Sequence, residues 1–293
     1  MKISDVLASK QPTLSFEVFP PKTTEVYESV LKATGEIAAL KPDFMSVTYG
    51  AGGGTRLYTT EIAKNIKDAG VPALAHLTCV GATKDGIKKH LEDLKAAGIE
   101  NILALRGDLP QGTTSTEGWE FQHASELVEQ IKACGDFCIG GACYPETHPE
   151  AKNSAEDILN LKKKVDAGCS FLTTQMFFDN SIFFNYLYKI REAGIHVPVV
   201  AGIMPVTNAK QMERIYKLSQ AFLPRRFVNL LDKFGDNPKA MRQAGIAYAT
   251  DQIIDLLASG IQNIHVYTMN KPGNAALLQS SLSEIIPSCK KEA

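Results

Sequence analysis

The segment NILALRGDLP (residues 101–110) changes abruptly from apolar to charged residues. Four apolar residues in a row (102–105) are typical of a strand that is buried on both faces. The run ends at Arg106, Gly107 and Asp108, an opposed pair of charges around a glycine. In proteins built on parallel strands, catalytic and binding residues lie mainly at the carboxyl ends of the strands. The segment therefore predicts a buried strand whose carboxyl end carries functional groups.

The same break from an apolar run into a compact polar cluster recurs along the chain. Such stretches are LSFEVFPP (14–21), FMSVTYGAGGGT (44–55), LAHLTC (74–79), GACYPETHPEAK (141–152) and FLTTQMFFD (171–179). Runs of strand type centre near residues 16, 46, 75, 103, 140, 172, 200 and 265. Helical periodicity fills the intervals, at about residues 26–40, 59–69, 84–97, 120–133, 155–167, 181–193 and 209–219. Several of these helices should close with a C-cap glycine: Gly70, Gly98, Gly135, Gly168 and Gly194.

Eight strands that alternate with helices predict an α/β fold, a (β/α)8 TIM-type barrel. A doubly wound sheet is the alternative, but its nucleotide loop should follow the first strand, where this chain has Pro20 and Pro21. Residues 224–231 and 239–259 are predicted to be extra helices before the last strand. Because no linker or low-complexity segment divides the chain, we expect residues 1–293 to form one domain.

The charges of the chain nearly cancel, with 31 basic and 32 acidic residues. This balance argues against a nucleic-acid or membrane partner and favours a small molecule or another protein. No apolar run is long enough to span a membrane and no signal peptide is evident, which predicts a cytoplasmic protein. The spacing of Cys134, Cys138 and Cys143 matches no common zinc or iron–sulfur motif, so we expect reduced core cysteines and no metal site.

Because all the βα loops of a barrel emerge on one face, the polar clusters should converge on one site. Glu17 lies among large apolar residues of the first strand, and burial penalises a charged carboxylate, which suits Glu17 to deliver a proton near neutral pH. Arg106 offers a planar fork for phosphate, with the Asp108 carboxylate two residues away. His76 alternates with apolar residues, so it is either a core histidine or a ligand contact.

Three further features favour a ring-containing, phosphate-bearing ligand. GAGGGT (50–55) lacks the third glycine of the dinucleotide fingerprint and is better explained as a loop that lets a ligand approach the backbone. The helix after YPETHPEAK presents Asp157, Asn160 and Lys164 on one face, and its amino end favours anions. Gln175 ends the sixth strand and can hydrogen-bond the edge of a heteroaromatic ring. The two phenylalanines after Met176 either stack on such a ring or pack in the core.

In order and spacing, SFEVFPP, VTYGA, HLTC, ALRGDLP, YPETHPEAK, DILNLKKKVDAG and TTQMFFD resemble the methylenetetrahydrofolate reductase family over essentially the whole chain. The resemblance implies the compact bacterial type, a barrel with FAD that reduces 5,10-methylenetetrahydrofolate to 5-methyltetrahydrofolate with NAD(P)H by ping-pong hydride transfer. It implies that Glu17 is the general acid that helps to open the folate ring. Asp108 would lie beside both the flavin and the folate, and Gln175 would hold the pterin and meet the nicotinamide.

The resemblance also implies the remaining contacts. Flavin positions are Tyr49, Ala51, His76, Arg106, Gly107, Asp108, Ala124, Tyr144, His148 through Ala151, Asp157, Asn160 and Lys164. Thr48 falls at a nicotinamide position, and Gln211 and Lys271 fall at folate positions. Lys271 departs from the pattern because related enzymes can carry arginine there, and lysine lacks the bidentate fork. Ile215 stands where relatives can carry an aromatic residue that stacks on the substrate.

Two alternative functions stay open at this point. One is a pterin-binding methyltransferase without flavin, which would purify colourless. The other is the folate-reducing subunit of an electron-transfer complex, whose partner would supply iron–sulfur clusters because this chain has no evident cluster ligands. NADH and NADPH are alternative donors, FMN is the alternative to FAD, and we expect a homo-oligomer.

Overall fold

The computed structural model describes residues 1–9, 12–21, 23–49, 56–109, 112–113, 116–219 and 221–289. Eight parallel strands form a closed barrel in sequence order, and the first strand pairs with the last. The strands are β1 (Thr13–Val18), β2 (Phe44–Val47), β3 (Ala73–Thr78), β4 (Asn101–Leu105), β5 (Cys138–Cys143), β6 (Phe171–Thr174), β7 (Val199–Ile203) and β8 (Asn263–Tyr267). The predicted (β/α)8 barrel is confirmed.

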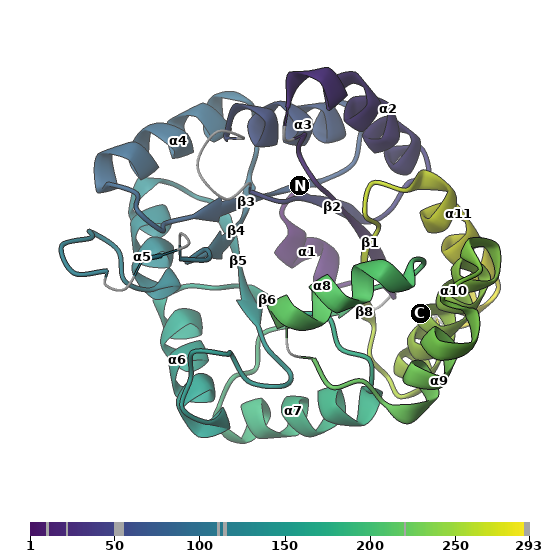
Figure 1. Cartoon of the computed structure of the whole chain (residues 1–293). Coiled ribbons are helices and arrows are strands. Elements are labelled where there is room, and N and C mark those ends of the chain that lie inside the picture. Colours follow the sequence, from purple (N-terminus) through teal and green to yellow (C-terminus); the bar gives the residue numbers. More distant parts are fainter. Residues whose placement is uncertain are drawn as a thin grey trace.

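Helices surround the strands, as Figure 1 shows in a view along the barrel. They are α1 (Ile3–Leu7), η1 (Thr24–Val26), α2 (Tyr27–Ala38), α3 (Arg56–Asp68), α4 (Lys84–Ala96), α5 (Ala124–Cys134), α6 (Ser154–Ala167), α7 (Asn180–Glu192), α8 (Ala209–Ser219), α9 (Arg225–Phe234), α10 (Pro238–Ala258), α11 (Pro272–Ser281) and α12 (Ile285–Ser288). The extra helices expected before the last strand are α9 and α10. Helix α8 crosses the mouth of the barrel (Figure 1).

The strands are buried on both faces, as their apolar sequences predict. Alternate side chains point into the barrel, where Phe44, Leu74 and Leu103 pack against α1 at the amino-terminal end. The backbone N–H of Ile3 donates to Oδ1 of Asn101 at 2.8 Å and fixes this plug. Helix α1 was not predicted from the sequence, because five residues carry too little periodicity to indicate a helix.

Glycine ends several helices as predicted. The conformation of Gly135 and the first residue of α5 differ from expectation. Gly70, Gly98 and Gly194 adopt φ values of 83°, 72° and 77°, the left-handed region that a C-cap requires. Gly135, in contrast, has φ 164° and is extended. Helix α5 begins at Ala124 rather than near residue 120, because the Glu126 carboxylate accepts the backbone N–H groups of two residues that precede it.

Helix α10 contacts the segment after β7 so closely that only glycine fits at position 245. A Cβ atom there would lie 1.8 Å from the carbonyl oxygen of Val206. We expect Gly245→Ala to lower the free energy of unfolding by about 1–3 kcal/mol or more, because backbone cannot move aside as a side chain can. Gly35→Ala in α2 is the matched control: its Cβ would meet nothing within 4 Å. It should be neutral or stabilising by up to about 1 kcal/mol. Urea unfolding curves that shift equally for the two variants would contradict this explanation.

Candidate active site

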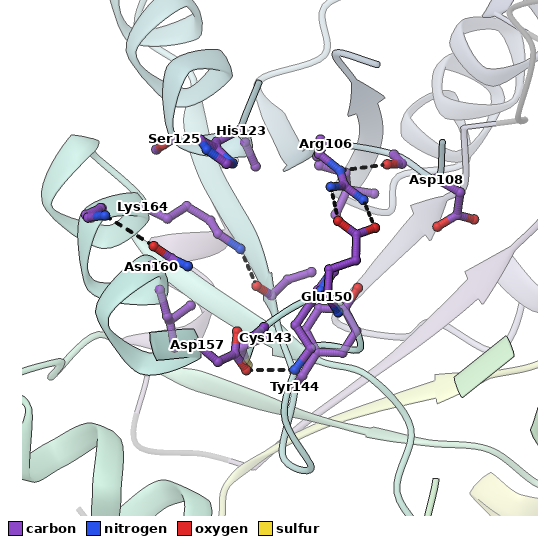
Figure 2. A pocket seen from close by; sticks show the side chains of 18 of the residues that line it. Arg106, Asp108, His123, Ser125, Cys143, Tyr144, Glu150, Asp157, Asn160 and Lys164 are labelled. Carbon is purple, nitrogen blue, oxygen red and sulfur yellow. Dashed lines mark hydrogen bonds and ion pairs between the residues drawn. The ribbon is translucent and has the colours of Figure 1, made fainter. Parts of the chain in front are cut away.

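A cavity of about 1180 Å³ opens beside the carboxyl ends of β3, β4 and β5 and extends along α6. Figure 2 shows Arg106 and Asp108 on the β4 side and Asp157, Asn160 and Lys164 on α6 across the pocket. Strand ends that are far apart in sequence thus converge on one site, as the barrel topology predicts. Twelve of the predicted flavin positions line the cavity: Tyr49, Arg106, Gly107, Asp108, Ala124, Tyr144, His148, Glu150, Ala151, Asp157, Asn160 and Lys164.

Arg106 is held in the cavity wall by a bidentate ion pair with Glu150, with both N–O distances at 2.5 Å. The hydrogen bond from Arg106 lowers the pKa of Glu150, and the same bond raises the pKa of Arg106. Gly107 follows with φ 89°, and a Cβ there would lie 2.8 Å from Cγ1 of Val80. A glycine is therefore required for the turn that brings Arg106 and Asp108 to the cavity.

The loop between β5 and α6 supplies the opposite wall. Asp157 accepts the backbone N–H of His148 at 2.9 Å, and the rings of Tyr144 and His148 make an edge contact at 4.6 Å. Burial lowers the pKa of His148, so its ring is neutral at pH 7 and can accept as well as donate a hydrogen bond. Burial raises the pKa of Tyr144 to about 12, so its phenol keeps its proton. These two rings therefore add neutral polar groups to a wall that also carries charged side chains.

Helix α6 brings a partly buried cation and an amino terminus to the same cavity. Asn153 caps the helix by accepting the N–H of Glu156 at 3.0 Å. Lys164 is partly buried and donates to the carbonyl oxygen of Ala142 at 2.5 Å, and desolvation lowers its pKa. The ammonium group in the last turn of α6 and the amino terminus at its other end are each suited to bind an anion. The chemistry of this wall fits a phosphate-bearing ligand.

Several residues that line the cavity were not singled out from the sequence. For all of them except Tyr186, which lies on α7, the available signal was that each adjoins a predicted position on the same loop or helix. They are His123, Ser125, Lys152, Glu156, Lys163 and Tyr186.

Glu17 lies in a second cluster, inside the barrel and not in the wall of this cavity. Its side chain is only 5% exposed. The Ser46 hydroxyl donates to Oε2 of Glu17 at 3.2 Å, and the Nε2 atoms of His76 and His265 lie 3.5 and 3.7 Å from the same oxygen. Burial lowers the pKa of His76 to about 4, so this ring is neutral at pH 7. Glu17 therefore sits between two imidazoles and a hydroxyl in the buried interior of the barrel.

His265 was not among the predicted site residues, although its alternation with apolar residues in a strand could have indicated an inward-facing side chain. In β8 it alternates with Ile264 and Val266, which are buried on the outer face. Its Nδ1 lies 2.7 Å from Oγ of Ser15, whose proton goes to the carbonyl oxygen of Ile264. Ser15 therefore accepts from Nδ1–H of His265, and Nε2 of the same ring faces Ser46 and Glu17.

The other predicted positions lie outside the cavity wall. The N–H of Thr48 donates to Val18 at 3.1 Å, and Oε1 of Gln175 accepts the N–H of Met176 at 3.0 Å. Lys271 donates to Oγ1 of Thr207 at 3.5 Å. Ile215 packs against a cluster that includes Met212 and Phe227. Ala51 and the side chain of Gln211 lie outside the described residues.

The two phenylalanines after Met176 are core residues, which decides between the alternatives left open by the sequence. Phe177 stacks on Phe183 with ring centroids 5.1 Å apart, and Phe178 stacks on Phe227 at 4.5 Å. Both phenylalanine side chains are buried. Their contacts secure the end of β6 and the helices beside it.

The six cysteines are free thiols. Burial raises the pKa of Cys79, Cys143 and Cys169 to about 12, so these three stay protonated. In the described segments, no group of three or more His, Cys, Asp or Glu side chains could hold a metal ion. None of the helices described is both long and apolar enough to cross a membrane.

The fold and the cavity define a (β/α)8 barrel of the class that binds small molecules at the carboxyl ends of its strands. The chain belongs to the methylenetetrahydrofolate reductase family, because the family model with that description matches residues 2–282.

Relatives from bacteria and plants agree with this assignment. The 5,10-methylenetetrahydrofolate reductase of Escherichia coli K12 is 40% identical over 262 residues, which cover 89% of this chain and 87% of the relative. Methylenetetrahydrofolate reductase (NADH) 1 of Zea mays is 38% identical over 289 residues, which cover 94% of this chain and 49% of the relative. The names of these relatives support a methylenetetrahydrofolate reductase activity for this chain.

A solved structure shares the fold. It is an uncharacterized protein from Clostridium thermocellum that binds two copies of 5-methyl-5,6,7,8-tetrahydrofolic acid, and it matches with a TM-score of 0.69. The match covers 97% of this chain and 100% of the other. At 16% identity, the likeness concerns the fold alone.

Proposed function

We propose that this chain reduces 5,10-methylenetetrahydrofolate to 5-methyltetrahydrofolate with NAD(P)H and binds one FAD in the cavity beside β3, β4 and β5. The observation that carries the proposal is the convergence of the flavin positions implied by the family on one cavity. Its size of about 1180 Å³ and its donor set fit a long ligand with phosphates. FAD, when bound, would supply the capacity to accept a hydride and pass it on.

The chain's own residues would hold this ligand by charge and by hydrogen bonds. Lys164 and Arg106 are two of the cations in the cavity wall that would neutralise phosphate, and the amino terminus of α6 would add its dipole. Arg106 is already paired with Glu150, so an anionic group that reaches Arg106 must compete with that carboxylate. The neutral His148 and Tyr144 would contribute polar contacts without added charge.

In this proposal, Glu17 delivers the proton that opens the folate ring. The leaving nitrogen must be protonated before the five-membered ring can open to an iminium, and a positioned acid supplies that proton. Gln175 would hold the pterin: its carbonyl oxygen is used by Met176, and in the described chain its Nε2 makes no hydrogen bond, so the amide NH₂ is available.

Binding of the flavin is the first test. Incubation of the purified protein with FAD at micromolar concentrations should give a yellow protein with one flavin per chain. If the protein did not bind FAD but did bind 5-methyltetrahydrofolate, the result would contradict the proposal and favour the flavin-free methyltransferase.

Asp108 should lower the midpoint potential of the flavin if its carboxylate lies beside the ring. A negative group there disfavours the anionic reduced ring, so Asp108→Asn should raise the midpoint potential. Because Asp108 is exposed and solvent screens its charge, we expect a rise of about 10–40 mV, together with slower folate reduction. Spectroelectrochemical titration measures the shift. Asp136→Asn removes an exposed charge beside Lys2, near the plugged end of the barrel, and serves as the control. An unchanged or lower potential in Asp108→Asn would place Asp108 away from the ring.

A further inference from the structure

A row of buried polar side chains leads from Glu17 into the barrel, away from its mouth. Strand β1 lies between β2 and β8, and its register pairs Glu17 with Ser46 and Ser15 with His265. Oγ of Ser46 lies 3.2 Å from both Oε2 of Glu17 and Nε2 of His265. On the other side of that ring, Nδ1 lies 2.7 Å from Oγ of Ser15, whose hydroxyl donates to the carbonyl oxygen of Ile264 at 3.0 Å. The row therefore ends at the backbone.

This row departs from the usual filling of a barrel. The interior of a (β/α)8 barrel is normally packed with branched apolar side chains. Here Ser15, Ser46 and His265 are all buried. Buried polar groups cost free energy unless each one finds a hydrogen-bond partner. We therefore expect the row to serve the group at its open end, which is Glu17.

The ring of His265 is held in one orientation. It stacks on Phe44, with ring centroids 5.9 Å apart and 8° between the planes, and Tyr267 meets it edge-on at 5.4 Å. Ser15 accepts from its Nδ1–H. A neutral imidazole that donates from one nitrogen accepts at the other. In the neutral ring, Nε2 is then an acceptor fixed 3.2 Å from Oγ of Ser46.

Ser46 has one hydroxyl proton and two acceptors within reach. Among the described residues, no other side chain donates a hydrogen bond to the Glu17 carboxylate. When Glu17 is charged, the Ser46 hydroxyl can donate to it. When Glu17 carries a proton, its O–H can donate to Oγ of Ser46, and the Ser46 hydroxyl can turn to Nε2 of His265. The two arrangements differ only by a rotation about the Cβ–Oγ bond.

Two other titratable side chains face Glu17, and neither offers a proton near pH 7. Nε2 of His76 lies 3.5 Å from Oε2 of Glu17, and burial lowers the pKa of His76 to about 4. Burial raises the pKa of Tyr267 well above its ordinary value, and its hydroxyl donates to the carbonyl oxygen of Thr174 at 2.6 Å. Together with His265, these are the titratable groups that the described residues bring to Glu17.

We propose that Ser46 and His265 are positioning residues of the folate half-reaction, in which the Ser46 hydroxyl turns from Nε2 of His265 to Glu17 as Glu17 gives up its proton. The inference rests on the proposed function. The O–H bond of Glu17 breaks as the leaving nitrogen of the folate takes the proton. The charge left on the carboxylate then meets a hydroxyl that is already in place. Ser46 and His265 keep their own protons, and a proton from water restores Glu17 after turnover.

The test follows the reoxidation of FAD-bound, dithionite-reduced protein by 5,10-methylenetetrahydrofolate as a function of pH. Chemical reduction separates this half-reaction from the nicotinamide. Ser46→Ala should slow it about tenfold on the low-pH side, because a hydrogen bond to the developing carboxylate is lost. The same loss disfavours the charged carboxylate, so the pH midpoint of the rate should move up by about one unit. Ser46→Thr keeps a hydroxyl and should recover most of the rate.

His265→Phe should move the midpoint in the opposite direction. Without Nε2, the Ser46 hydroxyl has only Glu17 to donate to, which favours the charged carboxylate and lowers the midpoint by about half a pH unit. The low-pH rate should stay within about threefold of the wild type. His265→Gln returns an acceptor near the place of Nε2 and should return the midpoint. As the control, Thr34→Val removes a buried hydroxyl of α2 that has no hydrogen-bond partner among the described residues, and it should change neither rate nor midpoint.

Opposite shifts in Ser46→Ala and His265→Phe would support the inference, since a loosened barrel would slow both variants without moving their midpoints apart. An unmoved midpoint in Ser46→Ala would overturn it, and this variant decides alone if His265→Phe does not fold. An upward shift in His265→Phe would also overturn it, because His265 would then act as a cation beside the carboxylate. Failure of the proposed function has a different signature: the folate would not reoxidise the wild-type flavin at any pH.

Discussion

Replacing Glu17 with glutamine is expected to lower the rate of folate reduction by about 10²–10⁴-fold and to leave flavin reduction by the nicotinamide near the wild-type rate. The two half-reactions differ in their need for a proton. Hydride passes directly between stacked rings, so the first half depends only on their alignment. The second half requires a proton on the leaving nitrogen of the folate before its ring can open.

The surroundings of Glu17 make this variant informative. Ser46 donates to the carboxylate at 3.2 Å, and glutamine keeps an oxygen in nearly the same place to accept that bond. His76 is neutral because burial lowers its pKa to about 4, so it cannot act as a substitute acid near pH 7. The loss should therefore reflect the missing proton rather than a disturbed barrel. If stopped-flow traces of Glu17→Gln showed both half-reactions slowed together, Glu17 would be structural.

The second large effect is expected on flavin affinity. Arg106→Gln should raise the dissociation constant for FAD by about 10–100-fold, because a charge-assisted contact with an anionic group is lost. Glu150→Gln should act in the opposite direction. It removes the carboxylate that occupies the Arg106 fork at 2.5 Å, so the ligand no longer competes with it.

Fluorescence titration of the apoprotein with FAD compares these two variants with the wild type. Both residues are partly exposed, and each substitution removes one charge from the same ion pair. Loss of the ion pair alone would therefore change affinity in the same direction in both variants. Weaker binding in Glu150→Gln as well as in Arg106→Gln would show that the pair itself closes the site, and that Arg106 does not bind the flavin directly.

Much of the fold follows from local signals in the sequence. Buried strands such as β4 consist of unbroken apolar runs, and glycines such as Gly70 mark helix ends by a conformation that other residues avoid. The elements that were missed lack such signals. Helix α1 has five residues and no capping side chain. Helix α11 follows Lys271 with Pro272 at its first position, a start signal that sequence analysis passed over.

The convergence of site residues on one cavity could be predicted, because the barrel topology brings the carboxyl ends of the strands together. The sequence indicated Arg106 and Lys164 at the ends of different elements, and the structure places both in one cavity. It did not indicate that Arg106 faces Glu150, or that His265 approaches Glu17 within 3.7 Å. Such pairings depend on the register and stagger of the strands and on side-chain rotamers, which no local pattern encodes.

The most direct test of the proposed reductase is anaerobic stopped-flow mixing of the FAD-bound protein in two steps. Mixing with NADH or NADPH should bleach the flavin absorbance, and mixing the reduced protein with 5,10-methylenetetrahydrofolate should restore it with formation of one 5-methyltetrahydrofolate per flavin. A flavin that neither nicotinamide reduces, or a reduced flavin that the folate fails to reoxidise, would contradict the proposal.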